Sequence, residues 1–393
     1  MKTLEQQGQR IRSMVRAFDQ QGDHRTGSRV DQDSGDWLYE QISALGARPE
    51  KIQFSLPLVQ IDECWVSLGD IKIDAVPLFD CNFPRRSSIS GKIGEIGTDA
   101  DIGVIMAPPQ AESAQVKLLY QSRRSHQHSA IVVVTDSHFP GTGIALLNAD
   151  DYAQPFGPPV VQIANRYWAE IKRIMKAKGS LSIRLKAKRN SGQAFNIQTR
   201  VNGSNPALDP VVIMTPRSSW WCSTSERAGG LVCFLEMIRK AVTFKGERSL
   251  VFLANTGHEL DHAGLASFLS ERPGIEKSAH LWVHLGANFA AASPIGARLQ
   301  FSDAVIQEGF IKLVKAFNSP VYKIKPEAER AVGEARNIHD AGGRYLSILA
   351  GNDLFHHPSD RWPAAVNTEN LEQWACIFEN LVPLLTRRDA FII

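Results

Sequence analysis

Two histidines with a glutamate between them, His258, Glu259 and His262, stand in the stretch NTGHELDHAGLASFL. The spacing H-E-x-x-H is typical of a zinc-binding helix, where histidines at i and i+4 share one face and the glutamate polarises the metal-bound water. The longer pattern H-E-x-x-H-x-x-G-x-x-H is not met, because Gly264 comes one residue early and no third histidine follows. The letters NTG also place His258 at a strand-to-helix turn, so the motif alone does not establish a helical zinc protease site.

The pattern of apolar side chains indicates the elements that position these residues. Apolar positions at helical spacing predict two opening helices, over residues 4–18 and 34–46. Short β-rich runs broken by glycine and proline occupy the chain from Cys64 to Arg189. Strands then alternate with helices, which predicts an α/β fold with a mostly parallel central sheet flanked by helices. We therefore assign residues 1–62 and 191–393 to one α/β domain and residues 63–190 to an inserted β-rich domain.

The ends of three predicted strands carry the polar residues of most interest. In parallel sheets of this kind, ligands bind beyond the carboxyl ends of the strands. The runs VVIM, VFLAN and LWV each lead into polar residues, and these include His258, Glu259 and His284. Their concentration at successive strand ends favours a functional site at this edge of the sheet.

The composition limits the classes of function. Hydrophobic residues make up 43% and charged residues 22% of the 393 positions, which is ordinary for a soluble enzyme. The formal net charge of +3 and the lack of a basic block interleaved with aromatics argue against a nucleic-acid partner. The sequence has neither a signal-peptide pattern nor a run of about 20 apolar residues, so no membrane association is expected. Five cysteines without C-x-x-C spacing favour a cytoplasmic, reducing setting.

Several stretches, in a fixed order, are similar to one known family. They are HRTGSRVDQDSGDWLYEQISALG, PVVIMTP, STSERAGGLVCFLEMIRKA, RSLVFLANTGHELDHAGLASFL and LFHHPSDRWPAAVNTENLEQWACIFENLV. Together they resemble the di-zinc aminopeptidase family that includes the glutaminyl cyclases, peptidase family twenty-eight, as a divergent member with altered ligand positions. The β-rich insert, with PFGPPVVQI near its end, resembles the protease-associated domain found in many members.

The resemblance implies a metal site that has lost ligands. The family's first ligand motif, H-x-D after a strand, is matched by Pro216 and Ser218, which do not bind metal as those residues do. The bridging aspartate is matched by Glu226, and the asparagine after it by Arg227. A second metal ion is therefore not expected.

The remaining positions imply a single zinc ion. The family's catalytic glutamate and the ligand after it are matched by His258 and Glu259, its next carboxylate by His284 and its last histidine by His356. By resemblance to the glutaminyl cyclases, the expected zinc ligands are Glu226, Glu259 and His356. Three protein ligands with an open fourth position are usual for catalytic zinc, and His284 is a candidate for a further ligand.

The other candidate residues receive roles around this ion. His258 and Glu259 are expected to take part in catalysis, with His258 as the proton shuttle, and His284 is a third catalytic candidate. Arg227, at a helix N-terminus, is expected to hold a substrate carboxylate. The further substrate-binding candidates are Trp220, Trp221, His262 and His357, of which His262 is expected to orient its neighbours.

Each assignment has a purely structural alternative. Glu226 and the pair His258 and Glu259 are also compatible with helix capping, and His284 with a hydrogen-bonded core histidine. The tryptophans are equally compatible with packing.

The sequence favours a hydrolase with an altered, mononuclear zinc site, acting on an amide, peptide or related carbonyl bond of a small molecule or peptide. One alternative is an inactive family member that binds a ligand or partner. Another is a metal-free enzyme that uses His258 and His284 as acid and base while Arg227 holds an anionic substrate. Self-association into a homo-oligomer is compatible with the sequence.

Overall fold

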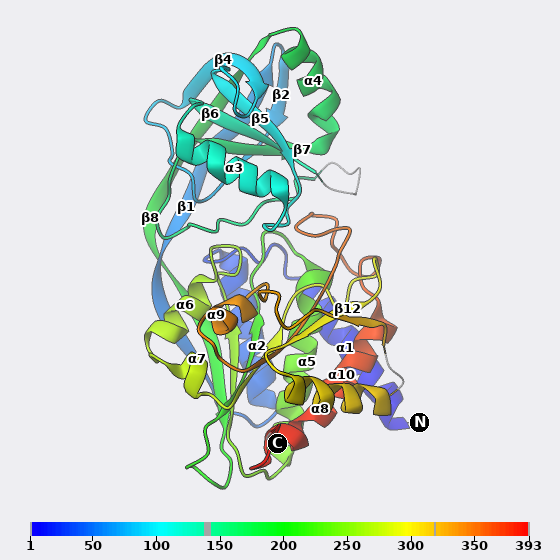
Figure 1. The fold of residues 1–393 in the computed structure, drawn as a ribbon. Coiled ribbons are helices and arrows are strands. Elements are labelled where there is room, and N and C mark those ends of the chain that lie inside the picture. The colour runs from blue at the N-terminus through cyan, green and yellow to red at the C-terminus, as the bar shows by residue number, and fades with distance from the viewer. Residues whose placement is uncertain (1, 137–142, 318–319, 392–393) are drawn as a thin grey trace.

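Two long paired strands run through both parts of the molecule in the computed structural model, which describes residues 2–136, 143–317 and 320–391 (Figure 1). Strand β1 (Pro49–Leu68) lies antiparallel to β8 (Ser180–Val201), with a bulge between Ile61 and Glu63. The chain between these strands, residues 69–179, forms the upper part in Figure 1 and is called the insert below. The predicted boundaries at residues 63 and 190 fall inside the two strands, and the division into domains stays a prediction.

The lower part is built on a sheet in the order β13-β12-β14-β11-β9-β10-β8. Its other strands are β9 (Val211–Pro216), β10 (Leu250–Asn255), β11 (Leu281–Leu285), β12 (Ala297–Phe301), β13 (Tyr322–Ile324) and β14 (Tyr345–Ala350). The neighbours β10, β9, β11 and β14 run parallel, and β8 and β12 join them antiparallel. The predicted mostly parallel α/β sheet is confirmed.

Helices cover both faces of this sheet. They are α1 (Lys2–Asp19), α2 (Arg29–Ala44), α5 (Thr224–Thr243), α6 (Ala263–Ser270), α7 (Ile275–Ser278), α8 (Ala304–Ala316), α9 (Ala335–Asp340) and α10 (Thr368–Leu385). Side chains alternate along β9, so Ile213 packs into the core beneath α5 and α10, while Val212 and Met214 pack on the opposite face. Both predicted opening helices are present, and the second starts at Arg29 because the Ser28 side chain caps it.

The insert has a hydrophobic core of its own. Strands β4 (Ser88–Glu95), β5 (Ile102–Ala107), β6 (Ala130–Thr135) and β7 (Val160–Ala164) are parallel neighbours. The short strands β2 (Ile71–Asp74) and β3 (Val76–Pro77), the helices α3 (Ala114–Ser125) and α4 (Trp168–Lys176) and the 3-10 turn Asn165–Tyr167 complete it. The two helices were not predicted from the sequence. Among the helices that the structure describes in either part, none has both the length and the apolar character needed to cross a bilayer.

A close backbone approach fixes the turn that carries His258 and His262. The Gly264 amide donates to the carbonyl of Thr256 at 3.0 Å, and the Asn196 side chain donates to the Gly264 carbonyl at 2.8 Å. A Cβ atom at residue 264 would lie 2.2 Å from the Thr256 carbonyl oxygen. Only glycine therefore allows α6 to begin this close to the end of β10.

Replacing Gly264 by alanine should force these backbones apart. We expect Gly264→Ala to lower the free energy of unfolding by about 1–3 kcal/mol, as overpacking does, when measured by urea denaturation. The control Ala266→Ser, at an exposed position of the same helix, should change it by less than about 0.5 kcal/mol. Equal stability of the two variants would show that the turn is not fixed by this contact.

Candidate functional site

A buried polar cluster lies at the carboxyl edge of the parallel strands. Ser218 follows β9, and its hydroxyl accepts from the Gly257 amide at 2.8 Å in the turn after β10. Glu226 comes from the first turn of α5, and His356 from the loop after β14. Every one of these side chains is buried. The edge predicted from the strand ends is thus where the polar residues meet.

The first centre consists of His258, His262 and Glu334. One ligand atom from each lies within 4.8 Å of the other two, and all three residues are buried. Nδ1 of His258 is 2.7 Å from a Glu334 oxygen, and Nδ1 of His262 is 2.8 Å from the side-chain oxygen of Asn337. The two imidazoles stack with their centroids 5.3 Å apart. H-E-x-x-H thus pairs its histidines across a turn that precedes α6, and the third residue comes from a distant loop.

His284 lies behind this centre. One ring nitrogen is 3.2 Å from the second oxygen of Glu334, and the other is 2.9 Å from the hydroxyl of Ser347 on the neighbouring strand β14. With no exposed surface and both nitrogens bonded, His284 has the contacts of a residue that positions Glu334. Its assignment as a catalytic group or zinc ligand stays a prediction.

The second centre consists of Glu226, Arg227 and His356. A guanidinium nitrogen of Arg227 is 2.6 Å from a Glu226 oxygen, and Nε2 of His356 is 3.6 Å from the same oxygen. The first contact is an ion pair that lacks the alignment of a hydrogen bond. Arg227 also donates through Nε to the Ser218 carbonyl at 2.6 Å. Arg227 was predicted to bind a substrate carboxylate, and in the structure its guanidinium is paired with Glu226 instead.

Glu259 is bonded within the fold. Its two oxygens accept from the Thr26 amide and from the Ser218 hydroxyl, each at 2.7 Å. Glu259 thus anchors the loop before α2, while the histidines on either side of it turn toward Glu334. Glu226 and His356 lie together as expected, but zinc ligation by Glu226, Glu259 and His356 stays a prediction.

A segment of the insert, residues 143–149, covers the second centre and is called the capping segment below. Nδ1 of His356 is 2.6 Å from the Leu146 carbonyl, and the Ala149 amide donates to the Glu259 carbonyl at 2.9 Å. The indoles of Trp220 and Trp221 donate to Asn148 and to the Ile144 carbonyl, each at 3.0 Å.

The two tryptophans and His357 therefore contact the chain itself. A Cβ atom on Gly143 would lie 2.8 Å from Nε2 of His357, which shows how closely the capping segment approaches. Substrate binding by Trp220, Trp221 and His357 stays a prediction.

Backbone strain is concentrated around the two centres. Eight described residues other than glycine have positive φ, and five of them lie here: Ser223, Asp261, His262, Asn288 and His356. Such conformations cost about 1 kcal/mol or more each and collect at functional sites, where the surrounding structure enforces them. The strain supports a functional origin for this arrangement.

Burial and neighbouring charges set the protonation of the cluster. Burial lowers the pKa of His258 to about 4, although Glu334 opposes this, and burial also lowers the pKa of His262. Burial alone would raise the pKa of Glu334, but the two histidines hold it well below its usual range. Burial likewise disfavours ionised Glu226, yet Arg227 and His356 lower its pKa to about 2. Both centres therefore contain an ionised carboxylate near pH 7.

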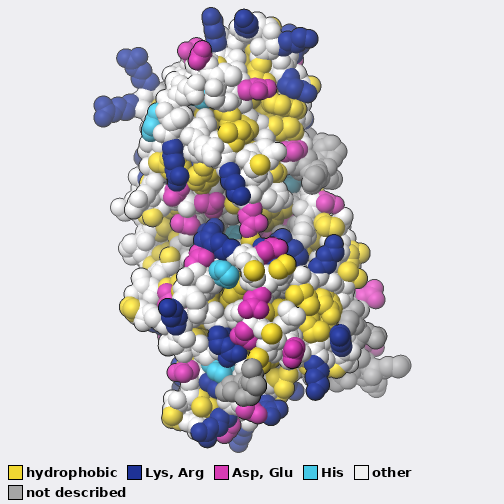
Figure 2. All heavy atoms as spheres, in the orientation of Figure 1, with side chains coloured by type: hydrophobic (Ala, Val, Ile, Leu, Met, Phe, Trp, Pro, Cys, Tyr) yellow, Lys and Arg dark blue, Asp and Glu magenta, His cyan; other side chains and the backbone are white. Residues whose placement is uncertain are grey.

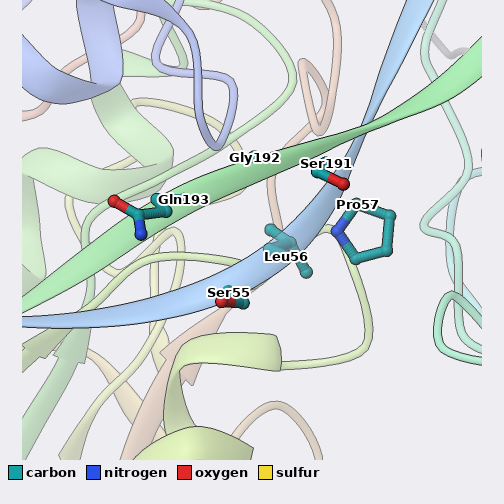
Figure 3. A pocket seen from close by; sticks show the side chains of 6 residues that line it. All are labelled: Ser55, Leu56, Pro57, Ser191, Gly192 and Gln193. Atoms are coloured by element: carbon teal, nitrogen blue, oxygen red, sulfur yellow. The ribbon is translucent and has the colours of Figure 1, made fainter.

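Two grooves on the surface border this region. One, of about 400 Å³, lies along the paired strands β1 and β8 and is lined by the six residues labelled in Figure 3, with Gln193 at one end and Pro57 at the other. The other, of about 530 Å³, is lined partly by Leu260 and Asp261 of the turn between the histidines and by Tyr152 of the insert. Figure 2 shows acidic and basic side chains gathered between the upper and lower parts.

Sequence reasoning missed Glu334. It immediately precedes the short helix α9 and follows no strand end, so neither strand pattern nor family motif indicated it. The one signal was its place three residues before Asn337 in GEARN, which is too general to identify a site.

Solved structures of aminopeptidases match nearly the whole chain. A peptidase M28 precursor from Shewanella amazonensis matches with a TM-score of 0.75 and 15% identity, over 98% of this chain and 96% of its own. A zinc aminopeptidase from Bacillus subtilis matches with a TM-score of 0.75 and 13% identity, over 96% and 94%. An aminopeptidase from Aneurinibacillus sp. strain AM-1 matches with a TM-score of 0.70 and 13% identity, over 99% and 95%.

These matches establish the fold. No protein-family model and no curated protein matches the sequence. The predicted resemblance is confirmed as a shared fold, that of the M28 peptidases and zinc aminopeptidases, over nearly the full length. The likeness of the insert to a protease-associated domain stays a prediction.

Acid should weaken the folded state through its buried histidines. Burial lowers the pKa of His24, which bonds the Cys222 carbonyl beside the site, to about 3. Between about pH 6.5 and pH 4, His24 is protonated in the unfolded chain but neutral in the folded chain. Its contribution to stability is therefore complete above pH 6.5 and falls by about 1.4 kcal/mol per pH unit on acidification. Urea denaturation of His24→Asn should show a shallower pH slope, and the exposed control His126→Asn the wild-type slope.

Removing Arg227 should destabilise the fold, because the buried charge of Glu226 then has no partner. We expect Arg227→Met to lower the free energy of unfolding at pH 7 by about 3–5 kcal/mol, because it leaves a buried charge uncompensated. Adding Glu226→Gln should restore part of this loss. In a double-mutant cycle, the exposed pair Arg29 and Asp33 serves as control and should couple by less than about 0.5 kcal/mol. Strict additivity at Glu226 and Arg227 would contradict the pairing.

Proposed function

We propose that the protein is a hydrolase with one divalent metal ion, most simply zinc, bound by His258, His262 and Glu334. The substrate is a small molecule or peptide cleaved at an amide, peptide or related carbonyl bond. The observation that carries this proposal is the approach of three potential ligand atoms to within 4.8 Å of one another in a buried site. The shared fold with zinc aminopeptidases supports it.

The residues present fit such an ion. Two imidazoles and one carboxylate form a usual ligand set for catalytic zinc, with a fourth position left for water or substrate. The lowered pKa values of the histidines keep them neutral near pH 7, the form that binds metal. The carboxylate of Glu334 then leaves a negative charge in the core that a cation would compensate. When bound, the ion would polarise a substrate carbonyl and lower the pKa of a water molecule.

Other residues of the chain hold the proposed ligands in place. Asn337 fixes one nitrogen of His262, and His284 with Ser347 fixes Glu334. Such partners of metal ligands keep their orientation and tune their basicity. The proposal retains the single zinc ion expected from the sequence but moves it from Glu226, Glu259 and His356. It also makes His258 a ligand in place of a proton shuttle.

A second candidate is a protein that binds a ligand without hydrolysis. The observation that favours it is the ion pair of Arg227 with Glu226, because a fixed guanidinium charge stands beside the carboxylate expected to bind metal. The capping segment also covers His356. The metal-free alternative would keep His258 as a base oriented by Glu334, while His284 remains bonded in the core.

Metal content tests the proposal. The untagged protein, loaded with zinc and washed, should retain about one ion per chain by elemental analysis. His258→Ala, His262→Ala and Glu334→Gln should each lose it, because each removes a ligand. Glu259→Gln and His356→Ala should retain it, and so should the control His280→Ala, whose ring bonds the Ala390 carbonyl.

The outcomes separate the candidates. Loss of zinc in Glu259→Gln and His356→Ala, with retention in Glu334→Gln, would return the ion to the ligand set expected from the sequence. A protein that retains no divalent metal after loading would sink the metal-enzyme proposal and leave the ligand-binding and metal-free alternatives.

A further inference from the structure

Five buried polar atoms without a hydrogen-bond partner converge at the second centre. They are both oxygens of Glu226, both terminal nitrogens of Arg227 and Nε2 of His356. The three side chains are at most 1% exposed, and their contacts of 2.6 and 3.6 Å meet at one Glu226 oxygen. Unpaired buried polar groups are rare in folded proteins, so each one requires an explanation. Five at a single point indicate that a polar group belongs there.

The atoms present both donors and acceptors. Nδ1 of His356 lies 2.6 Å from the Leu146 carbonyl and must donate to it, while Nε2 lies 3.6 Å from a Glu226 oxygen. Arg227 offers only donors, and ionised Glu226 offers only acceptors. The charges of Arg227 and Glu226 cancel, so the centre does not select a charged ligand.

These donors and acceptors favour some chemical groups of a ligand over others. A carboxylate would pair with Arg227 but repel Glu226 and leave its oxygens unsatisfied. An ammonium group would pair with Glu226 and leave Arg227 unsatisfied. A primary carboxamide is neutral, its oxygen accepts from Arg227, and its NH₂ group donates to Glu226. Buried polar groups that stay unpaired strongly disfavour ligands lacking the matching atoms.

We propose that Glu226 and Arg227, with His356 beside them, form a binding site for a neutral primary carboxamide. If the protein is the hydrolase proposed above, this site makes primary amides its substrate class. The catalytic part of the inference therefore rests on the proposed function. Binding itself needs no turnover and no metal, so it can be measured separately from the proposed zinc centre. Entry requires the capping segment to move, since Leu146 is bonded to His356.

Three probes with one ring and different polar groups test this site. Benzamide, benzoate and benzylamine are titrated into the full chain, with binding followed by ligand-detected NMR. Benzamide should bind, and benzoate and benzylamine should bind at least about tenfold more weakly. The titration is made with zinc-loaded and with chelator-treated protein, and benzamide should bind both. Failure of the zinc proposal therefore leaves this result unchanged.

Variants of Glu226 and Arg227 test whether these two residues bind the amide. Glu226→Gln, Arg227→Met and Arg227→Lys should each weaken benzamide binding by at least about tenfold, and the lysine variant keeps the charge if the methionine variant does not fold. Arg123→Met is the matched control, because Arg123 forms an equally buried ion pair with Asp80 in the insert. It should bind benzamide as the wild type does.

Three results would overturn the proposal. They are no benzamide binding by the wild type, equal binding of the three probes, and benzamide binding that survives in every folded variant of Glu226 and Arg227. The first would mean that water satisfies these atoms.

Discussion

The buried carboxylate of Glu334 ties together three segments that are far apart in the sequence. His258 contacts one of its oxygens from the turn after β10, and His284 contacts the other from β11, while Glu334 itself precedes α9. An ionised carboxylate without partners would cost several kcal/mol to bury. The turn with both histidines of H-E-x-x-H is therefore held where Glu334 requires it. Two adjacent left-handed residues, Asp261 and His262, are part of that arrangement.

The two carboxylates at this edge are compensated differently. Glu226 faces the guanidinium of Arg227, a nitrogen of which lies 2.6 Å from a Glu226 oxygen. Glu334 faces the imidazole of His258, whose pKa burial lowers to about 4, so that this ring is neutral near pH 7. One half of the site is thus electrically complete without a ligand, and the other half gains from a cation. This asymmetry is why the metal proposal concerns Glu334 and the amide proposal concerns Glu226.

Local patterns in the sequence predicted the strands of the sheet. The side-chain contacts in the site depend on residues far apart in the sequence, which local patterns do not show. The strands β9, β10 and β11 and the helix α5 were predicted because their apolar runs are long and end in clear turn signals. The sequence also predicted that His258, His262, Glu226 and His356 lie near one edge of the sheet. It could not show that Glu259 turns toward Thr26, because that partner lies in a loop more than two hundred residues earlier. Nor could it show that Trp220 and Trp221 would bond the insert, because the path of residues 143–149 depends on how the insert packs.

The long ladder of β1 and β8 carries a consequence for the order of folding. Its pairs run from Ser67 opposite Ser182, next to the insert, to Pro49 opposite Thr199 in the lower sheet. Forming any of these pairs first would close a long loop at a large entropic cost. Folding of the insert removes that cost, because its own core holds Leu68 and Leu181 together. Once that core has formed, each further pair toward Pro49 and Thr199 closes only a short loop. Folding of the insert therefore lowers the entropic cost of placing β8 beside β10 at the edge of the central sheet.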